Sequence, residues 1–443
     1  MTDVRTAAVE PAGFVRFYLP LVATSYLLTA TNPILAAALA RTSDPATALA
    51  GYGVAFALIG MVYAPLLVVQ QVAAQRLLRV GDLAPVRRFS IVVALLLTGV
   101  AALVAFTPVG VFVFRSLVGV QDAILDEALS AMTGLWPVPA LTAVRALHQG
   151  RLVAGHRTKP IAVATGARTG VLTVVAFALT TTPAGAWLGA MAFTTGLAAE
   201  APVVTFAPAP TPQVPELTEL EAEGEDRLLS FSTPLMLNVV LWWTTPLIIN
   251  SVLARTPEPD CSIAAFTVVE AVAWFLSAPV GQLQHASLAL VDSRARHRRV
   301  RRYAAILAMV VTGILGVLAV PEVREWILWT GFRLDPSLLE PAGLAFPVAA
   351  LYPLLYGHRQ YYQGLFVRAG CTLLVGRGAV LRVVVVLAAS PILLGPMGDN
   401  GARLGVTLAV VGLVAESVFL EVMSRLRALD LLDKAPTASL QEA

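Results

Sequence analysis

Charged residues are scarce in this sequence. Only 13% of its 443 residues are aspartate, glutamate, lysine or arginine, and 57% are hydrophobic. A soluble protein carries about 25% charged residues, and the mean hydropathy here is +0.76. This composition excludes an ordinary soluble domain and indicates a polytopic membrane protein that is surrounded by membrane lipid.

The sequence also lacks the motifs of common enzymes. It contains no Gly-x-Ser-x-Gly, no His-Glu-x-x-His and no Walker loop, so we expect no enzyme activity, no cofactor and no ATPase domain within the chain. Its two cysteines do not suggest a disulfide or a metal site. No basic run with interleaved aromatic residues points to a nucleic-acid partner.

Long apolar runs, by contrast, are abundant. Twelve of them are long enough, at about 20 residues, to cross a membrane as helices. They cover residues 14–40, 47–76, 87–108, 124–152, 160–181, 185–207, 228–254, 262–291, 301–320, 338–367, 371–395 and 401–427. We therefore expect an all-α protein with an N-terminal segment at 1–13, an N-lobe at 14–207, a linker at 208–226, a C-lobe at 227–427 and a tail at 428–443.

The two halves repeat each other. Residues 139–150 and 353–364 share the order Pro, five residues, Arg, three residues, Gln-Gly, at a shift of 214. Gln70 matches Gln284 at the same shift, and Glu200 matches Glu416 at a shift of 216. Each unit holds six expected helices, so both units have one membrane orientation and form parallel repeats.

Positive charge sets the expected orientation. Fifteen lysines and arginines fall in the loops after the even-numbered helices 2, 4, 8 and 10, and six in the loops after the odd-numbered ones. By the positive-inside rule, both termini and the linker are cytoplasmic. We expect a monomer in the cell membrane, the inner membrane of a bacterium.

Arg145 and Arg359 are the leading site candidates, because a charge in hydrocarbon is expensive and is usually kept for function. A guanidinium offers five donors in a fixed fork that suits phosphate or carboxylate. Neighbouring side chains add the further candidates His148, His358, Gln149, Gln363 and Tyr362. We predict that they line a cavity for a small anionic substrate. The alternative is that each arginine pairs with a carboxylate and ties helices together.

A second set of candidates is also paired across the repeat. Arg168 and Arg382 lie one to two turns into their helices, where snorkelling to the interface is the alternative to a role in the site. Glu200 and Glu416 lie in the last helix of each half. They are either carriers of a coupling proton or salt-bridge partners of the arginines. Glu270 is the other main buried acid.

Paired prolines and outer arginines complete the candidates. A proline frees a backbone carbonyl and bends its helix, so it serves as a hinge or is simply tolerated. The predicted hinges are Pro20, Pro65, Pro234 and Pro279. Arg41 and Arg255 end the first helix of each half on the outer side. We expect them to be interfacial anchors, with an outer gate as the alternative.

Several stretches resemble a known family. Residues 380–390, 401–405 and 412–417 are similar to the progressive ankylosis (ANK) family, which lies in the multidrug/oligosaccharidyl-lipid/polysaccharide (MOP) exporter superfamily. Further similarity lies in residues 17–21, 148–150, 279–281 and 353–364. The resemblance implies a MATE-like exporter with twelve helices in two lobes around a central cavity. Animal members are associated with export of pyrophosphate, nucleotides and citrate-like anions, and Arg359, with Arg145 by symmetry, matches the family's pattern.

These observations predict an exporter of small organic or phosphate-containing anions that works by alternating access through a cationic cavity. One alternative is a flippase for lipid-linked anionic sugars, which predicts a lateral opening and a larger cationic cavity. Another is a multidrug–cation antiporter of the same superfamily. That transporter would need acidic residues in its N-lobe cavity, and the runs 14–40 and 47–76 contain none.

Overall fold

Helices account for every regular element in the described part of the chain, as the composition predicts. This computed structural model describes residues 11–80, 83–155, 157, 159–208, 225–291, 293–369 and 371–428. Within it, ten helical segments are long and apolar enough to cross a membrane. An eleventh span forms if α18 (Pro336–Ala349) and α19 (Tyr352–Arg368) are counted together. The chain is a multi-pass membrane protein of all-α fold.

The remaining elements follow the predicted order. The N-terminal half contains α2 (Pro11–Thr29), α3 (Thr31–Leu39), α4 (Pro45–Leu67), α5 (Val69–Val80), α6 (Ala84–Phe106), α7 (Pro108–Val111), η1 (Phe112–Val118), α8 (Asp122–Leu135), α9 (Val138–Ala154), α10 (Lys159–Leu179) and α11 (Gly185–Phe206). The C-terminal half adds α12 (Glu225–Leu253), α13 (Pro259–Leu276), α14 (Ala278–Gly281), α15 (Leu283–Leu290), α16 (Arg294–Val317), α17 (Pro321–Trp326), η2 (Ile327–Phe332), α20 (Thr372–Met397), α21 (Gly401–Met423) and η3 (Ser424–Ala428). Most of the predicted N-terminal segment, linker and tail lies outside the described residues.

Prolines divide several helices that the sequence predicts as continuous. A proline lacks an N–H group and its ring clashes with the carbonyl four residues earlier. Pro33, Pro139 and Pro353 each lie four residues after the last residue of α2, α8 and α18, respectively. The predicted helix at 124–152 is therefore the pair α8 and α9, which is not among the apolar spans. The predicted helix at 338–367 is the pair α18 and α19, bent by 43°.

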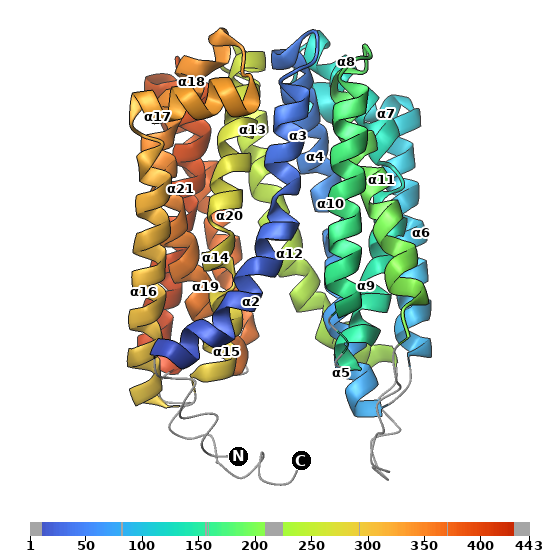
Figure 1. The fold of residues 1–443 in the computed structure, drawn as a ribbon, viewed down its shortest axis with the longest axis vertical. Coiled ribbons are helices and arrows are strands. Elements are labelled where there is room, and N and C mark those ends of the chain that lie inside the picture. Colours follow the sequence, from blue (N-terminus) through green and yellow to red (C-terminus); the bar gives the residue numbers. More distant parts are fainter. Residues whose placement is uncertain are drawn as a thin grey trace.

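The first helix of each half packs against the opposite half (Figure 1). From α2, the Tyr18 hydroxyl donates to the Pro279 carbonyl at 2.5 Å and the Ser25 hydroxyl donates to the Ala278 carbonyl at 3.1 Å. From α12, the Asn250 amide donates to the Gly53 carbonyl of α4 at 3.3 Å. These reciprocal contacts place the midline of the molecule between α2–α4 and α12–α13.

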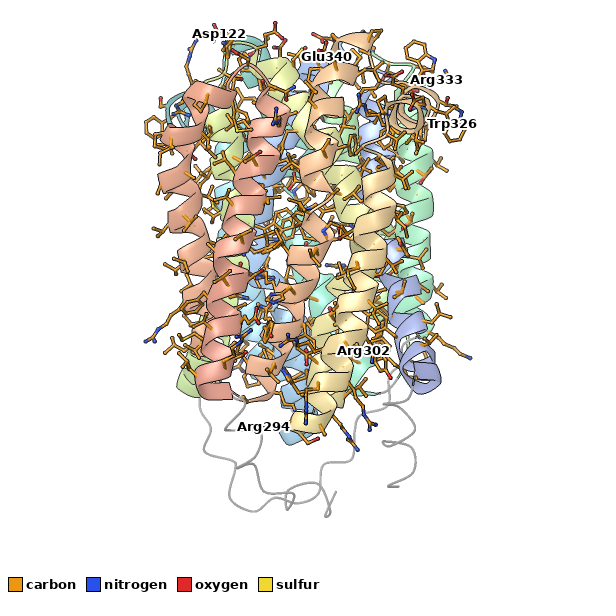
Figure 2. The ribbon with its side chains drawn as sticks, turned by 90° about the vertical axis from the view of Figure 1, so that its left-hand side faces the viewer. Asp122, Arg294, Arg302, Trp326, Arg333 and Glu340 are labelled. Atoms are coloured by element: carbon orange, nitrogen blue, oxygen red, sulfur yellow. The ribbon has the colours of Figure 1, made fainter. Side chains whose placement is uncertain are left out.

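The two ends of the molecule differ. The ribbons of the two halves run close together at the end that carries α8 and α18, and they diverge toward the end that carries α5 and α15 (Figure 1). Arg294 and Arg302 lie at the divergent end, whereas Asp122, Arg333 and Glu340 lie at the opposite end (Figure 2). The divergent end is thus the one with the basic loop that the sequence predicts to be cytoplasmic.

One close helix contact occurs in both halves. A Cβ atom added to Gly150 would lie 2.6 Å from the carbonyl oxygen of Gln70, and one added to Gly364 would lie 2.3 Å from that of Gln284. Gly150 and Gly364 match at the shift of 214, and so do Gln70 and Gln284. The internal repeat is therefore a repeat in packing as well as in sequence.

We expect Gly364→Ala to destabilise the protein by about 1–3 kcal/mol, because its new methyl group overpacks the contact between α19 and α15. The matched control is Gly170→Ala on α10, where a Cβ atom meets nothing within 4 Å. That change should be neutral or slightly stabilising, because alanine is the better helix former. Melting temperatures in one detergent compare the two variants. Equal melting temperatures would contradict this packing.

Candidate functional site

The predicted residues of the C-terminal half form a buried triad. Glu416 of α21 is fully buried between Arg359 of α19 and Arg382 of α20. Arg359 Nε donates to Glu416 Oε1 at 2.7 Å, and Arg382 Nη1 donates to Glu416 Oε2. Both carboxylate oxygens of this C-lobe triad are therefore bound by a guanidinium.

Helix α12 completes the C-lobe triad. Arg382 Nε donates to the Thr245 hydroxyl at 3.2 Å, and Arg382 Nη2 donates to the Leu241 carbonyl at 3.0 Å. The Trp242 ring covers both guanidinium groups, whose central carbons lie 4.3 Å (Arg359) and 4.5 Å (Arg382) from its centroid. Cations over an indole ring gain electrostatic attraction, so α12 holds both arginines in place.

The N-terminal half contains the matching triad in a looser form. Glu200 of α11 is fully buried, and its Oε2 lies 3.7 Å from Arg145 Nη1 of α9 and 3.6 Å from Arg168 Nη1 of α10. Gln149 Nε2 donates to Glu200 Oε1 at 2.9 Å. Each triad, N-lobe and C-lobe, thus places two arginines around one glutamate and keeps an excess positive charge.

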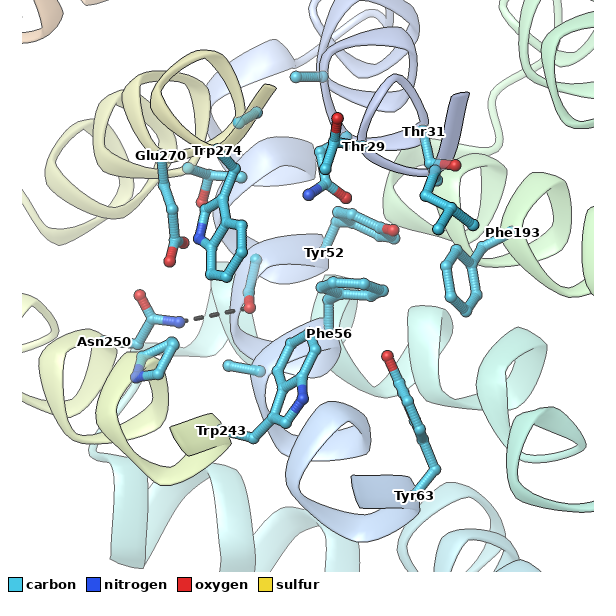
Figure 3. Close-up of a pocket in the computed structure, with 18 of the residues that line it drawn as sticks. Thr29, Thr31, Tyr52, Phe56, Tyr63, Phe193, Trp243, Asn250, Glu270 and Trp274 are labelled. Carbon is cyan, nitrogen blue, oxygen red and sulfur yellow. Dashed lines mark hydrogen bonds between the residues drawn. The ribbon is translucent and has the colours of Figure 1, made fainter. Parts of the chain in front are cut away.

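A cavity of about 240 Å³ lies at the midline (Figure 3). Its charged lining residues are Arg168 and Glu270. Its wall is rich in aromatic side chains, namely Tyr52, Phe56, Tyr63, Phe193, Trp242, Trp243 and Trp274. A smaller cavity of about 40 Å³ shares Trp242, Glu270 and Trp274 with it and adds Arg382. One guanidinium from each triad therefore reaches these central cavities.

Glu270 is the cavity residue that the sequence did not assign to the site. It lies on α13, and no cation of the described chain lies within salt-bridge distance of its carboxylate. Its counterpart at the shift of 214 is Phe56, which lines the same cavity. The available signal was a single acidic residue inside an apolar run, without a matching acid in the other half.

The other predicted site residues lie outside the central cavity. His358 Nε2 lies 3.1 Å from Glu421 Oε2, and the ring of Tyr362 packs on His358 with centroids 4.7 Å apart. Gln363 of α19 is buried, and His148 of α9 is half-buried. These side chains, and those of Arg145, Arg359 and Gln149, are not among the residues that line the cavity of Arg168. Arg145 nevertheless lies close to that cavity, because it shares the Glu200 carboxylate with Arg168.

The predicted hinge prolines occupy different positions relative to helix breaks. Pro65 lies three residues before the break at Val68, and Pro279 lies in the short helix α14, two residues after the break at Ser277. Helices α2 and α12 continue past Pro20 and Pro234. Only the second expected helix of each half is therefore broken near its predicted hinge.

The outer arginines make reciprocal contacts between the halves. Arg41 Nη1 donates to the Phe332 carbonyl at 3.0 Å and Arg41 Nη2 to the Gly331 carbonyl at 2.9 Å, both in η2. Arg255 Nη1 donates to the Val118 carbonyl at the end of η1, at 3.1 Å. Val118 and Phe332 match at the shift of 214. We call these paired contacts the outer clamp; they lie at the end where the two halves meet.

No family model and no curated protein sequence matches this chain. Several solved structures do match it in fold. One is described as an inward-facing conformation of a multidrug resistance MATE family transporter of the MOP superfamily; it has a TM-score of 0.73 at 14% identity, over 92% of this chain and 96% of that chain. This chain has the MATE transporter fold.

Two further solved structures share the MATE fold with this chain. An outward-facing MATE family transporter of the MOP superfamily has a TM-score of 0.64 at 14% identity, over 94% of this chain and 95% of that chain. The lipid II flippase MurJ in an inward closed conformation has a TM-score of 0.66 at 10% identity, over 94% of this chain and 90% of that chain. Such low identities show a shared fold and carry no substrate from those proteins to this one.

The similarity to the inward-facing MATE structure, with a TM-score of 0.73, exceeds the similarity to the outward-facing MATE structure, with a TM-score of 0.64. This agrees with the arrangement of the two halves, which meet at the end of the molecule that carries the outer clamp and diverge at the end that carries Arg294 (Figures 1 and 2). The two halves of the described chain are thus arranged more like those of the inward-facing MATE structure than like those of the outward-facing one.

Proposed function

We propose that this chain is an alternating-access transporter that exports small organic or phosphate-containing anions of the pyrophosphate, nucleotide or citrate kind. The observation that carries this proposal is the excess positive charge of both triads beside the central cavity. We further propose that it belongs to the ANK branch of the MOP superfamily. It acts as a monomer in the cell membrane, with both termini on the cytoplasmic side that carries Arg294 and Arg302.

Electrostatics supports an anionic substrate. Two unit charges about 8 Å apart interact by about 2 kcal/mol at an effective dielectric constant of about 20, and more strongly where water is excluded. Among the described residues, the two triads and Glu270 together contain four arginines and three glutamates. The surroundings of the cavity therefore keep a positive charge even when every glutamate is ionised.

The volume of the cavity supports a small substrate over a lipid-linked sugar. Pockets for drug-sized ligands occupy roughly 300–1,000 Å³, and the central cavity is about 240 Å³. A pyrophosphate or citrate ion suits that space better than the headgroup of a lipid-linked oligosaccharide. The flippase alternative would require a larger cavity in another conformation.

A multidrug–cation antiporter is the second candidate, and one observation favours it. Glu270 faces the cavity without a partner cation among the described residues, beside the ring of Trp274 (Figure 3), and Trp242 lines the same cavity. A carboxylate and aromatic faces together suit an organic cation. The N-lobe runs 14–40 and 47–76 contain no acidic residue, whereas Glu270 lies in the C-lobe.

The substitution Glu270→Gln separates the two functions by the sign of its effect. For an anion transporter, we expect pyrophosphate to bind the variant roughly tenfold or more tightly, because a negative charge leaves the cavity wall. For a cation antiporter, tetraphenylphosphonium binding would weaken instead. Titration calorimetry on purified protein in lipid nanodiscs measures both ligands.

The matched control for this experiment is Glu340→Gln, which removes an exposed carboxylate at the outer end (Figure 2). Its affinities should equal those of the wild type. If Glu270→Gln weakens tetraphenylphosphonium binding and pyrophosphate binds neither protein, the anion proposal is wrong.

A further inference from the structure

The two triads differ although their residues repeat. In the C-lobe triad, each oxygen of Glu416 accepts a hydrogen bond from an arginine. In the N-lobe triad, Glu200 lies 3.6–3.7 Å from its arginines and accepts a hydrogen bond only from Gln149, among the described residues. The N-lobe arginines are therefore held near their carboxylate by charge, without the directed hydrogen bonds of the C-lobe.

The N-lobe triad also contains polar atoms without partners. Arg145 Nε, Arg168 Nε and Glu200 Oε2 are buried and have no hydrogen-bond partner in the described part of the chain. No side-chain atom of Arg359, Arg382 or Glu416 is in that condition. Buried charged donors are costly to leave unbonded, so the N-lobe triad is the one that gains most from a ligand.

A break in the first helix explains the difference. In the C-lobe, the unbroken helix α12 brings Thr245 to Arg382 Nε. The counterpart of Thr245 at the shift of 214 is Thr31, which follows the break between α2 and α3. The Thr31 hydroxyl is buried and has no partner among the described residues, just as Arg168 Nε has none. Pro33 lies two residues after Thr31, whereas α12 is continuous through Pro246 and has leucine at position 247, which matches Pro33.

Access to the two triads differs in the same direction. Trp242 covers both arginines of the C-lobe triad, and its counterpart in the N-lobe is the smaller Leu28. Arg168 and Thr31 both line the 240 Å³ cavity. The Arg145 side chain is 14% exposed, against 5% for Arg359. Arg168 and Thr31 are therefore within reach of a ligand in the cavity, and Arg145 shares the Glu200 carboxylate with Arg168.

We propose that the N-lobe triad is the binding site for the anionic group of the substrate, and that the C-lobe triad is a structural lock. A phosphate or carboxylate group binds between Arg145 and Arg168, with the Thr31 hydroxyl as an additional donor. Glu200 is the resident counter-ion that holds the two arginines together in the empty site and competes with the substrate for them. This inference rests on the proposed function. It assigns binding to one repeat and stability to the other, although the two repeats carry the same arginines and glutamate in sequence.

The test is pyrophosphate binding by the full chain in lipid nanodiscs. Glu200→Gln keeps the size of the side chain and an oxygen that accepts from Gln149, and it removes the competing charge. We expect pyrophosphate to bind this variant at least about tenfold more tightly, an effect that unfolding does not produce. Arg168→Gln should weaken binding at least about tenfold.

The matched C-lobe variant is Glu416→Gln, which we expect to lower the melting temperature without tightening pyrophosphate binding. Equal gains in affinity for Glu200→Gln and Glu416→Gln would overturn the inference. So would wild-type affinity in a folded Arg168→Gln variant. If the wild type binds neither pyrophosphate nor citrate, the proposed function fails together with this inference. If the wild type binds them and the two lobes respond alike, only this inference fails.

Discussion

Glu416→Ala is expected to lower the free energy of unfolding by about 3–5 kcal/mol. The Glu416 carboxylate is fully buried and binds Arg359 and Arg382, so its removal leaves two buried guanidinium groups without their counter-ion. An equilibrium unfolding titration in mixed detergent micelles measures the effect. We expect it to exceed the effect of any surface substitution in this chain.

Two comparisons make this prediction specific. Glu421→Ala removes a carboxylate that is 25% exposed and pairs with His358 and Arg425, so it should cost about 1 kcal/mol or less. Adding Arg359→Met and Arg382→Met to Glu416→Ala should restore most of the stability, because apolar groups of similar size replace a buried ion cluster well. A Glu416→Ala protein as stable as Glu421→Ala would contradict the buried C-lobe triad.

The double variant Arg41→Gln with Arg255→Gln is expected to shift the protein toward an outward-open conformation. The two arginines of the outer clamp donate three hydrogen bonds to carbonyls of the opposite half. Hydrogen bonds from charged donors are worth about 1.5–3 kcal/mol each. Partial exposure of the two arginines reduces the free energy of each hydrogen bond. We therefore expect a change of at least about tenfold in the ratio of the two conformations.

Spin labels report the opening directly. Asp126 on α8 and Glu340 on α18 are exposed at the outer end, one in each half. Labels at these positions, in a protein whose two natural cysteines are replaced, should show a longer distance population in the double variant. Arg115→Gln is the control, because Arg115 pairs with Asp122 of its own half. An unchanged distance distribution in the double variant would show that the outer clamp does not control the opening of this end.

Much of the fold could be predicted because charged residues and prolines inside apolar runs mark the internal repeat. Charged residues in apolar runs either find partners or reach the interface, so the sequence left open whether Arg168 and Arg382 snorkel, line the site or pair with Glu200 and Glu416. The structure places each glutamate between two arginines. An apolar run also reports its length but not its bends, so the breaks at α8–α9 and α18–α19 were missed.

The remainder depends on contacts across the midline, which a repeat pattern does not encode. Periodicity cannot show that α2 and α12 contact the opposite half, nor that Trp242 of α12 covers the arginines of its own C-lobe triad. Glu270 was recognised as a buried acid, but its place in the cavity depends on the packing of α13 against α4. The functional differences between the repeats lie where they depart from symmetry.

Efflux from proteoliposomes tests the central claim most directly. Vesicles loaded with pyrophosphate, ATP or citrate would carry either the wild type or the variant Arg145→Gln with Arg168→Gln, with folding of both confirmed by melting. The account predicts efflux of at least one of these anions from wild-type vesicles and its loss with the variant. Efflux of none of them from vesicles with folded wild-type protein, alongside transport of tetraphenylphosphonium, would contradict it.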